Sequence, residues 1–202
     1  VQPRGRSIKS VYQGHALKFI TERGITEYDI KKYKIGFCED GLYQHRIIVP
    51  SHDEDGILNY FVGRSYMESG MKYKNPNVSK DVVGFDYHIA WSRPIVICEG
   101  VFDAMSIRRN AIPMFGKKPP RKLLMKIFQK RCKIIYIALD DDAKKEAYML
   151  GEFFSDFGID SKVVNLPKDK DPNDLGFDKM SALIEQTLSS SFSDTIQARL
   201  YG

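Results

Sequence analysis

Residues 134–142 read IIYIALDDD, an apolar run that ends in three aspartates. A short run of this kind is typical of a strand that is buried on both faces of a parallel sheet. Two other stretches have the same design: residues 95–98 (IVIC) precede Glu99, and residues 161–166 (SKVVNL) precede an acidic loop. Segments with helical periodicity alternate with these runs, so the sequence predicts a parallel sheet covered by helices.

Carboxylates follow each of the three predicted strands. They are Glu99, then Asp140–Asp142, then the acidic residues of the loop 169–174. In open parallel sheets, ligands bind at the carboxyl ends of the strands, so we expect these groups to gather in one crevice. Gathered carboxylates repel one another and need a cation, and oxygen ligands suit a hard ion. We therefore expect Mg²⁺ there, with Mn²⁺ as a substitute.

The spacing within the acidic segments suggests individual roles. At a strand end alternate residues point the same way, so Asp140 and Asp142 can share a metal while Asp141 turns aside. The alternative is that these aspartates cap the helix that follows. Asp103 lies one helical turn beyond Glu99, where it either supports the metal site or adds a favourable charge to the first helical turn.

The N-terminal part has a different pattern. Residues 15–37 predict two short helices, with Gly24 ending the first and Thr26 and Asp29 forming a capping box at the start of the second. Two β-like runs, 46–50 and 57–62, flank a polar turn and predict a hairpin. The segment 63–93, rich in Gly, Lys, Asn and Pro, is expected to be irregular.

Composition and charge narrow the possible partners. The 202 residues are 43% hydrophobic, with a net charge of +5 and a pI of about 9.0, which fits a polyanionic partner. Between Lys117 and Lys133 there are eight Lys or Arg and no acid; this segment either tracks a DNA backbone or forms a solvated helix face. No long apolar segment or signal peptide is present, so we expect a cytoplasmic protein without membrane contact. The three cysteines and four histidines lack zinc-ligand spacing, so no zinc is expected in this chain.

These motifs resemble a known family. Glu99-Gly100, Asp103 and the later D-x-D resemble the Toprim domain, which bacterial-type primases, topoisomerases and some nucleases share. The flanking motifs, over residues 16–175, are similar in order and spacing to the catalytic core of the bacterial DnaG-type replicative primase. They are AxxFIxERGITxxxIxxYxIGF from Ala16, RIIVP from Arg46, VGR from Val62, KYKNP from Lys72, VVGF from Val82 and LPKDKDPNDL from Leu166.

The resemblance implies a fold and a domain plan. The fold is α/β, a Toprim-type parallel-sheet domain preceded by a smaller α+β N-terminal subdomain. We expect the subdomain at residues 1–90, the metal-binding catalytic domain at 91–177, and a C-terminal helix and tail at 178–202.

The resemblance also implies an activity. The chain would be a nucleotidyltransferase, a DNA-directed RNA polymerase of the primase type. It would join ribonucleoside triphosphates into short RNA primers on single-stranded DNA by divalent-metal-dependent phosphoryl transfer. The implied catalytic residues are Glu99, Asp140 and Asp142, and Glu99 also takes the proton of the attacking 3′-hydroxyl. The implied metal ligands are Glu99, Asp103, Asp140, Asp142 and Asp171. The implied nucleotide- and template-binding residues are Arg46, Arg64, Lys72 and Asn75.

The chain also departs from the family. Phe115-Gly116-Lys117 replaces the family's L-G-T motif. No zinc-binding module precedes the core, and little of the family's further helical subdomain or helicase-binding region follows Leu175. Contact with a replicative helicase is therefore expected to use regions not present here. The compact form is similar to phage proteins. Two other functions remain open: a Toprim-type nuclease, or a nucleic-acid-binding module without catalysis.

Overall fold

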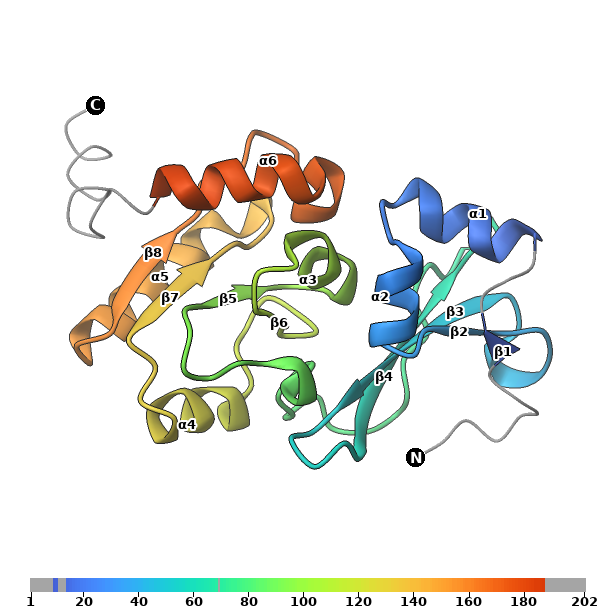
Figure 1. Ribbon diagram of the computed structural model, residues 1–202, viewed down its shortest axis with the longest axis horizontal. Helices are drawn as coiled ribbons and strands as arrows, with labels where there is room; N and C mark the ends of the chain where they lie inside the picture. The colour runs from blue at the N-terminus through green and yellow to red at the C-terminus, as the bar shows by residue number, and fades with distance from the viewer. Residues whose placement is uncertain (1–8, 11–13, 69, 188–202) are drawn as a thin grey trace. The chain divides into compact units, whose positions relative to one another are not determined.

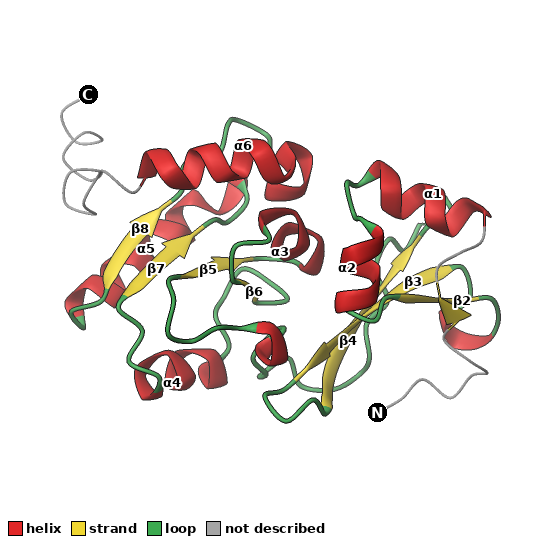
Figure 2. Ribbon diagram, in the orientation of Figure 1, coloured by secondary structure: helices red, strands yellow, loops and turns green. Residues whose placement is uncertain are grey.

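The protein consists of two compact units. The computed structural model describes residues 9–10, 14–68 and 70–187, and these divide into Val1–Tyr87 and His88–Gly202 (Figure 1). The first unit has an antiparallel sheet and the second a parallel one, as the strands in Figure 2 show. The predicted architecture, an α/β parallel-sheet domain preceded by a smaller α+β subdomain, is confirmed.

The N-terminal unit is built on a sheet in the order β1-β2-β3-β4. The strands are β1 Lys9–Ser10, β2 Gly36–Cys38, β3 Arg46–His52 and β4 Leu58–Ser65. The predicted hairpin is confirmed as β3 and β4. Strand β2 was not predicted, because its three residues, Gly-Phe-Cys, are too few to show a two-residue period.

The predicted helix pair is confirmed as α1 (Gly14–Glu22) and α2 (Glu27–Lys32). The Thr26 backbone N–H donates to Asp29 Oδ2 at 2.9 Å, and the Asp29 N–H donates to Thr26 Oγ1 at 3.3 Å, which completes the capping box. Gly24 has a φ of 72°, the left-handed conformation that ends a helix at little cost when no Cβ is present.

The segment 63–93 contains little regular structure, as expected. After β4, its regular elements within the described residues are the single bridge of Arg64 with Tyr73 and a 3₁₀ turn, η2 (Asp86–His88). A second 3₁₀ turn, η1 (Gly41–Tyr43), precedes β3. Phe85 is buried and its ring lies 4.5 Å from that of Tyr33 on α2's C-terminal side. The segment therefore returns to the core of the N-terminal unit.

The second unit holds a parallel sheet in the order β6-β5-β7-β8. The strands are β5 Ile95–Cys98, β6 Ala111–Pro113, β7 Ile134–Ile137 and β8 Asp160–Val163. All four residues of β5 are buried, as their continuous apolar character predicts. Strand β6 was not predicted, because it is three residues long and ends in proline.

Helices cover both faces of this sheet. They are α3 Val101–Ile107, α4 Arg121–Gln129, α5 Lys144–Asp156 and α6 Pro172–Thr187, and a 3₁₀ turn, η3 (Asp141–Ala143), precedes α5. Helices α3 and α6 pack together on one face. On the other face α4 packs against α5, where the Phe128 ring lies 5.2 Å from that of Phe157. This division follows from right-handed crossovers.

The predicted C-terminal helix is part of a longer element. Helix α6 begins at Pro172, before the expected boundary at residue 178, and Gly176 (φ 72°) kinks it. The expected tail, residues 188–202, lies outside the described residues. Among the described helices, none is both long and apolar enough to span a membrane.

Candidate metal centre

The strand order of the second unit creates a crevice at one place. From β5 the chain crosses to β6 at the sheet edge, and from β6 it returns past β5 to β7. The connections that leave β5 and β7 therefore lie on opposite faces, which opens a space at the carboxyl ends of these two strands. Glu99 is the first residue after β5, and Asp140 follows β7. Both carboxylates are thus placed at the point where α/β sheets bind ligands.

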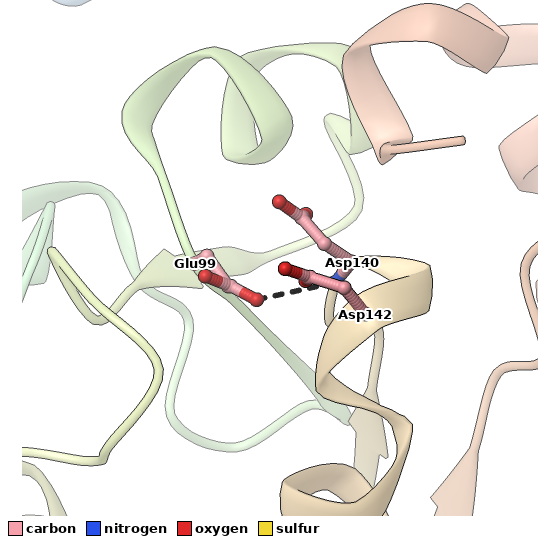
Figure 3. Close-up of side chains that lie close together, drawn as sticks. All are labelled: Glu99, Asp140 and Asp142. Atoms are coloured by element: carbon pink, nitrogen blue, oxygen red, sulfur yellow. Dashed lines mark hydrogen bonds between the residues drawn. The ribbon is translucent and has the colours of Figure 1, made fainter. Parts of the chain in front are cut away.

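Three carboxylates come together there. Glu99, Asp140 and Asp142 each offer an oxygen, and these three oxygens lie within 4.8 Å of one another. Figure 3 shows the three side chains close together, and its dashed line marks the hydrogen bond from Asp140 N–H to Glu99 Oε1. The nitrogen and oxygen of this bond are 3.4 Å apart. We call these three residues the carboxylate cluster.

The cluster is electrostatically strained when no cation is bound. Burial, followed by the charge of Asp140, raises the pKa of Glu99 to about 7. Burial, followed by the charges of Asp171 and Asp142, raises the pKa of Asp140 to about 6. Both pKa shifts mean that the ionised form of these two carboxyl groups is disfavoured without a cation. The carboxylate cluster would therefore attract a cation strongly.

The donor set fits a hard divalent cation. Asp140 Oδ1 is buried and has no hydrogen-bond partner among the described residues, so it has an oxygen lone pair available for a ligand. The alternative of a helix cap is not supported, since the Asp140 side chain makes no capping hydrogen bond to η3. Mg²⁺ prefers a few carboxylates with water and substrate phosphates completing its shell. Glu99, Asp140 and Asp142 are the residues that would hold it.

Asp103 lies outside the cluster and caps α3. Its Oδ2 accepts from the Gly100 N–H at 2.9 Å. The carboxyl is 8% exposed, and its burial, followed by the charge of Asp140, raises its pKa to about 8. This contact favours the helical-turn interpretation over direct ligation. Gly100 itself has an extended backbone; it is needed because a Cβ there would lie 2.9 Å from Asp103 Oδ2.

Asp171 and Asp141 are held by other partners. Asp171 Oδ1 accepts from the Asp174 N–H at 2.6 Å at the start of α6, although its charge still raises the pKa of Asp140. Asp141 turns aside, as the alternation predicts: it pairs with Lys144 and accepts from the Asp169 N–H at 3.0 Å.

One contact of the cluster was not anticipated. Lys117 Nζ donates to Asp142 Oδ2 at 2.7 Å. In the sequence, Lys117 is the first residue of the basic segment 117–133. Only its replacement of the family's threonine in the L-G-T motif marked the position as unusual.

Arg46, in the N-terminal unit, is occupied by backbone carbonyls. Its guanidinium donates to Met71 O at 3.0 Å, to Lys72 O at 3.4 Å and to Gly63 O at 3.5 Å, and the residue is 8% exposed. It therefore ties the segment 71–72 to β4, and a structural role accounts for its burial.

Arg64 and Lys72 line an open pocket of about 390 Å³, together with Phe19 and Tyr66. The Arg64 guanidinium lies 4.5 Å from the ring centroid of Tyr73 and 5.9 Å from that of Phe19. Stacking orients its donors and leaves them suited to an anion. Asn75 is half-buried and lines no part of this pocket, so the structure groups two of the four predicted binding residues.

Comparisons with known proteins agree with this architecture. The Toprim-like family matches residues 96–176. An uncharacterised protein of Mycoplasma genitalium is 29% identical over 181 residues, or 83% of this chain and 81% of that protein. A DNA primase of Clostridium acetobutylicum is 25% identical over 201 residues, covering 86% of this chain and 33% of the primase. The chain thus spans a third of that primase's length.

Several solved primase cores have a similar fold. The E. coli primase catalytic core superposes with a TM-score of 0.74 at 17% identity, covering 95% of this chain and 79% of that one. The RNA polymerase domain of the Mycobacterium tuberculosis primase DnaG gives 0.73 at 18% identity, with coverages of 95% and 82%. Both the family match and the superpositions confirm the predicted resemblance: residues 96–176 form a Toprim-like domain, in a chain with the fold of a DnaG-type primase catalytic core.

Proposed function

We propose that this chain is the catalytic core of a DNA primase, which joins ribonucleotides into short RNA primers on single-stranded DNA. The observation that carries the proposal is the carboxylate cluster at the switch point of a primase-like fold. Its Clostridium relative is named a DNA primase, and one structure of the same fold is of a primase catalytic domain bound to single-stranded DNA (TM-score 0.75). In this proposal residues 91–177 provide the chemistry and residues 1–90 bind nucleotide or template.

Each acidic residue would have a distinct task. Divalent ions, Mg²⁺ or Mn²⁺, supply charge neutralisation for the triphosphate and activation of a 3′-hydroxyl. Asp140 and Asp142 hold the ion site from the turn after β7, and Glu99 faces them from β5. Glu99, whose pKa of about 7 is close to neutral pH, is suited to accept the 3′-hydroxyl proton. Asp103 and Asp171 then act indirectly, because their carboxyl groups hold the starts of α3 and α6.

The proposed anion contacts lie on the N-terminal unit. Arg64 and Lys72, which share a pocket, would bind phosphates of a nucleotide or of the template, while Arg46 and Asn75 would shape that surface. The basic segment 117–133, with exposed Arg121 and Lys122 on α4, would follow the DNA backbone. Such binding releases counterions, so we expect it to weaken as the salt concentration rises. In this proposal the protein acts in the cytoplasm of a bacterial cell.

The proposal is tested by one assay on the purified chain. It is incubated with single-stranded DNA, ribonucleoside triphosphates and Mg²⁺ or Mn²⁺, and the products are resolved by size. We expect oligoribonucleotides to form only when the metal is present. Their yield should fall at least about 100-fold in Glu99→Gln and in Asp140→Asn, since each substitution removes a charge that the transition state uses. Glu152→Gln, an exposed change on α5, is the matched control and should retain synthesis.

Two other outcomes would replace the proposal. Shortened DNA, lost in the same two variants, would indicate a Toprim-type nuclease. Metal-independent DNA binding, with neither synthesis nor cleavage, would indicate a binding module. The pocket beside Arg64 and Lys72 favours synthesis, since a nuclease has no need of a triphosphate site.

A further inference from the structure

Lys117 supplies a positive charge at the cluster. It lies in the loop between β6 and α4, 25 residues before Asp142 in sequence, and its ammonium meets Asp142 Oδ2 at 2.7 Å. A lysine side chain is protonated at neutral pH, so this group carries a full positive charge. The contact therefore places an ammonium on Asp142, one of the three residues whose carboxylate oxygens lie within 4.8 Å of one another.

The same contact is reversible. The Lys117 side chain is 44% exposed and that of Asp142 is 73% exposed, so water can replace either partner. An ammonium is a compact point charge on a flexible stem, which can leave a carboxylate without disturbing the backbone. A divalent ion that uses Asp142 would meet this ammonium at close range, where like charges repel.

We propose that Lys117 is a built-in counter-cation, which neutralises Asp142 in the metal-free protein and has to release Asp142 when a divalent ion binds. The inference rests on the metal site of the proposed function. Its consequence is competition: Lys117 lowers the affinity of the cluster for the ion and limits the repulsion among the carboxylates when the ion is absent. Lys117 is thus a positioning residue that acts through Asp142 and regulates how much of the carboxylate cluster is occupied by the divalent ion.

The test is a titration of Mn²⁺ into the purified chain, followed by calorimetry and by the paramagnetic resonance signal of free Mn²⁺. Lys117→Met removes the ammonium, and Lys118→Met removes the same charge from the next residue, which is also exposed. We expect Lys117→Met to bind Mn²⁺ about two- to fivefold more tightly than the parent chain, the range of a solvent-exposed ion pair. The gain in Mn²⁺ affinity of Lys118→Met should be less than half of that of Lys117→Met. The Mn²⁺ affinity of Lys117→Arg should be close to that of the parent chain.

A second measurement separates competition from a change in folding. The rise in melting temperature on adding Mn²⁺ should be larger in Lys117→Met than in the parent, because the variant starts from a more repulsive cluster. Equal affinities for Lys117→Met and Lys118→Met would overturn the inference while leaving the metal site intact. A parent chain whose Mn²⁺ binding is absent, or unchanged by Asp140→Asn, would overturn the inference and the metal site of the proposed function together.

Discussion

At the scale of single residues, the site is made of groups that oppose folding. Burial and mutual repulsion raise the pKa of Glu99 to about 7 and that of Asp140 to about 6, so each carboxylate would be more stable ionised in water than in the cluster. Such groups add nothing to the free energy of folding at neutral pH. Their arrangement makes sense for a protein that binds a cation at this place.

Asp140→Asn should therefore separate stability from metal binding. Without divalent ions we expect the variant to melt about 2–4 °C higher than the parent, the shift that ~1 kcal/mol gives in a chain of this size. With Mn²⁺ the parent should be stabilised and the variant should not. Differential scanning fluorimetry with and without the ion measures both effects.

The control for this comparison is Glu152→Gln on the exposed face of α5. It also removes one negative charge, but away from the cluster. If it raised the melting temperature as much as Asp140→Asn, general charge reduction would explain the result and repulsion within the cluster would not.

The sequence predicted the acidic residues but not all their partners. Glu99, Asp140 and Asp142 could be found because each follows an apolar strand, and strand order places them together. The contacts of Lys117 with Asp142 and of Arg46 with Met71 could not be predicted, since each joins residues 25 positions apart in sequence and depends on how the chain folds back. Local patterns contain no information about such pairs.

At the scale of elements, α3 depends on a buried acid. Asp103 caps the helix through Gly100, and its pKa of about 8 means that the folded protein retains a proton which the unfolded chain, near 3.8, releases. The stability from this group is complete below pH 3.8 and is lost as the pH rises through 8.

The metal-free protein should therefore become less stable between pH 7 and pH 8.5, by up to about 1.4 kcal/mol per pH unit for one proton. Asp103→Asn keeps an oxygen acceptor for the Gly100 N–H and has no proton to lose, so its stability should change less over this range. Urea unfolding at several pH values measures the slopes. Asp156→Asn, exposed at the end of α5, should keep the parent's slope, and identical slopes in all three proteins would refute this assignment.

Strand β4 has its own point of close contact. Lys74 N–H donates to Gly63 O at 2.8 Å, and a Cβ on Gly63 would lie 2.5 Å from Lys74 O. Gly63→Ala should separate the strand from the segment that carries Lys72 and destabilise the protein by about 1–3 kcal/mol.

Chemical unfolding of Gly63→Ala measures this loss. Gly70→Ala is the control, because a Cβ there meets nothing within 4 Å. Equal stability of the two variants would show that the segment is not held against β4 in solution.

Elements were predicted where a pattern was long enough to recognise. The capping box of α2, the β3–β4 hairpin and strands β5, β7 and β8 have several residues of consistent period or a turn with defined chemistry. Strands β2 and β6, with three residues each, are stabilised by pairing with neighbours rather than by their own composition. Such strands can be identified only once the neighbouring strands of the sheet are known.

At the scale of the whole molecule, the chain combines two units with different tasks in the proposal. The N-terminal unit presents Arg64 and Lys72 around a pocket, and the second unit presents the carboxylate cluster. A cation site and an anion pocket are both needed for the polymerisation of triphosphates. The proposed activity therefore belongs to the chain as a whole, and its first requirement is that the cluster binds a divalent ion.

The most direct test of that requirement is the anomalous scattering of a crystal of the chain soaked in Mn²⁺. We predict a peak within about 2.5 Å of carboxylate oxygens from both Asp140 and Glu99 or Asp142, with Lys117 displaced from Asp142. Density that shows these side chains turned apart, with no manganese between them, would contradict the account.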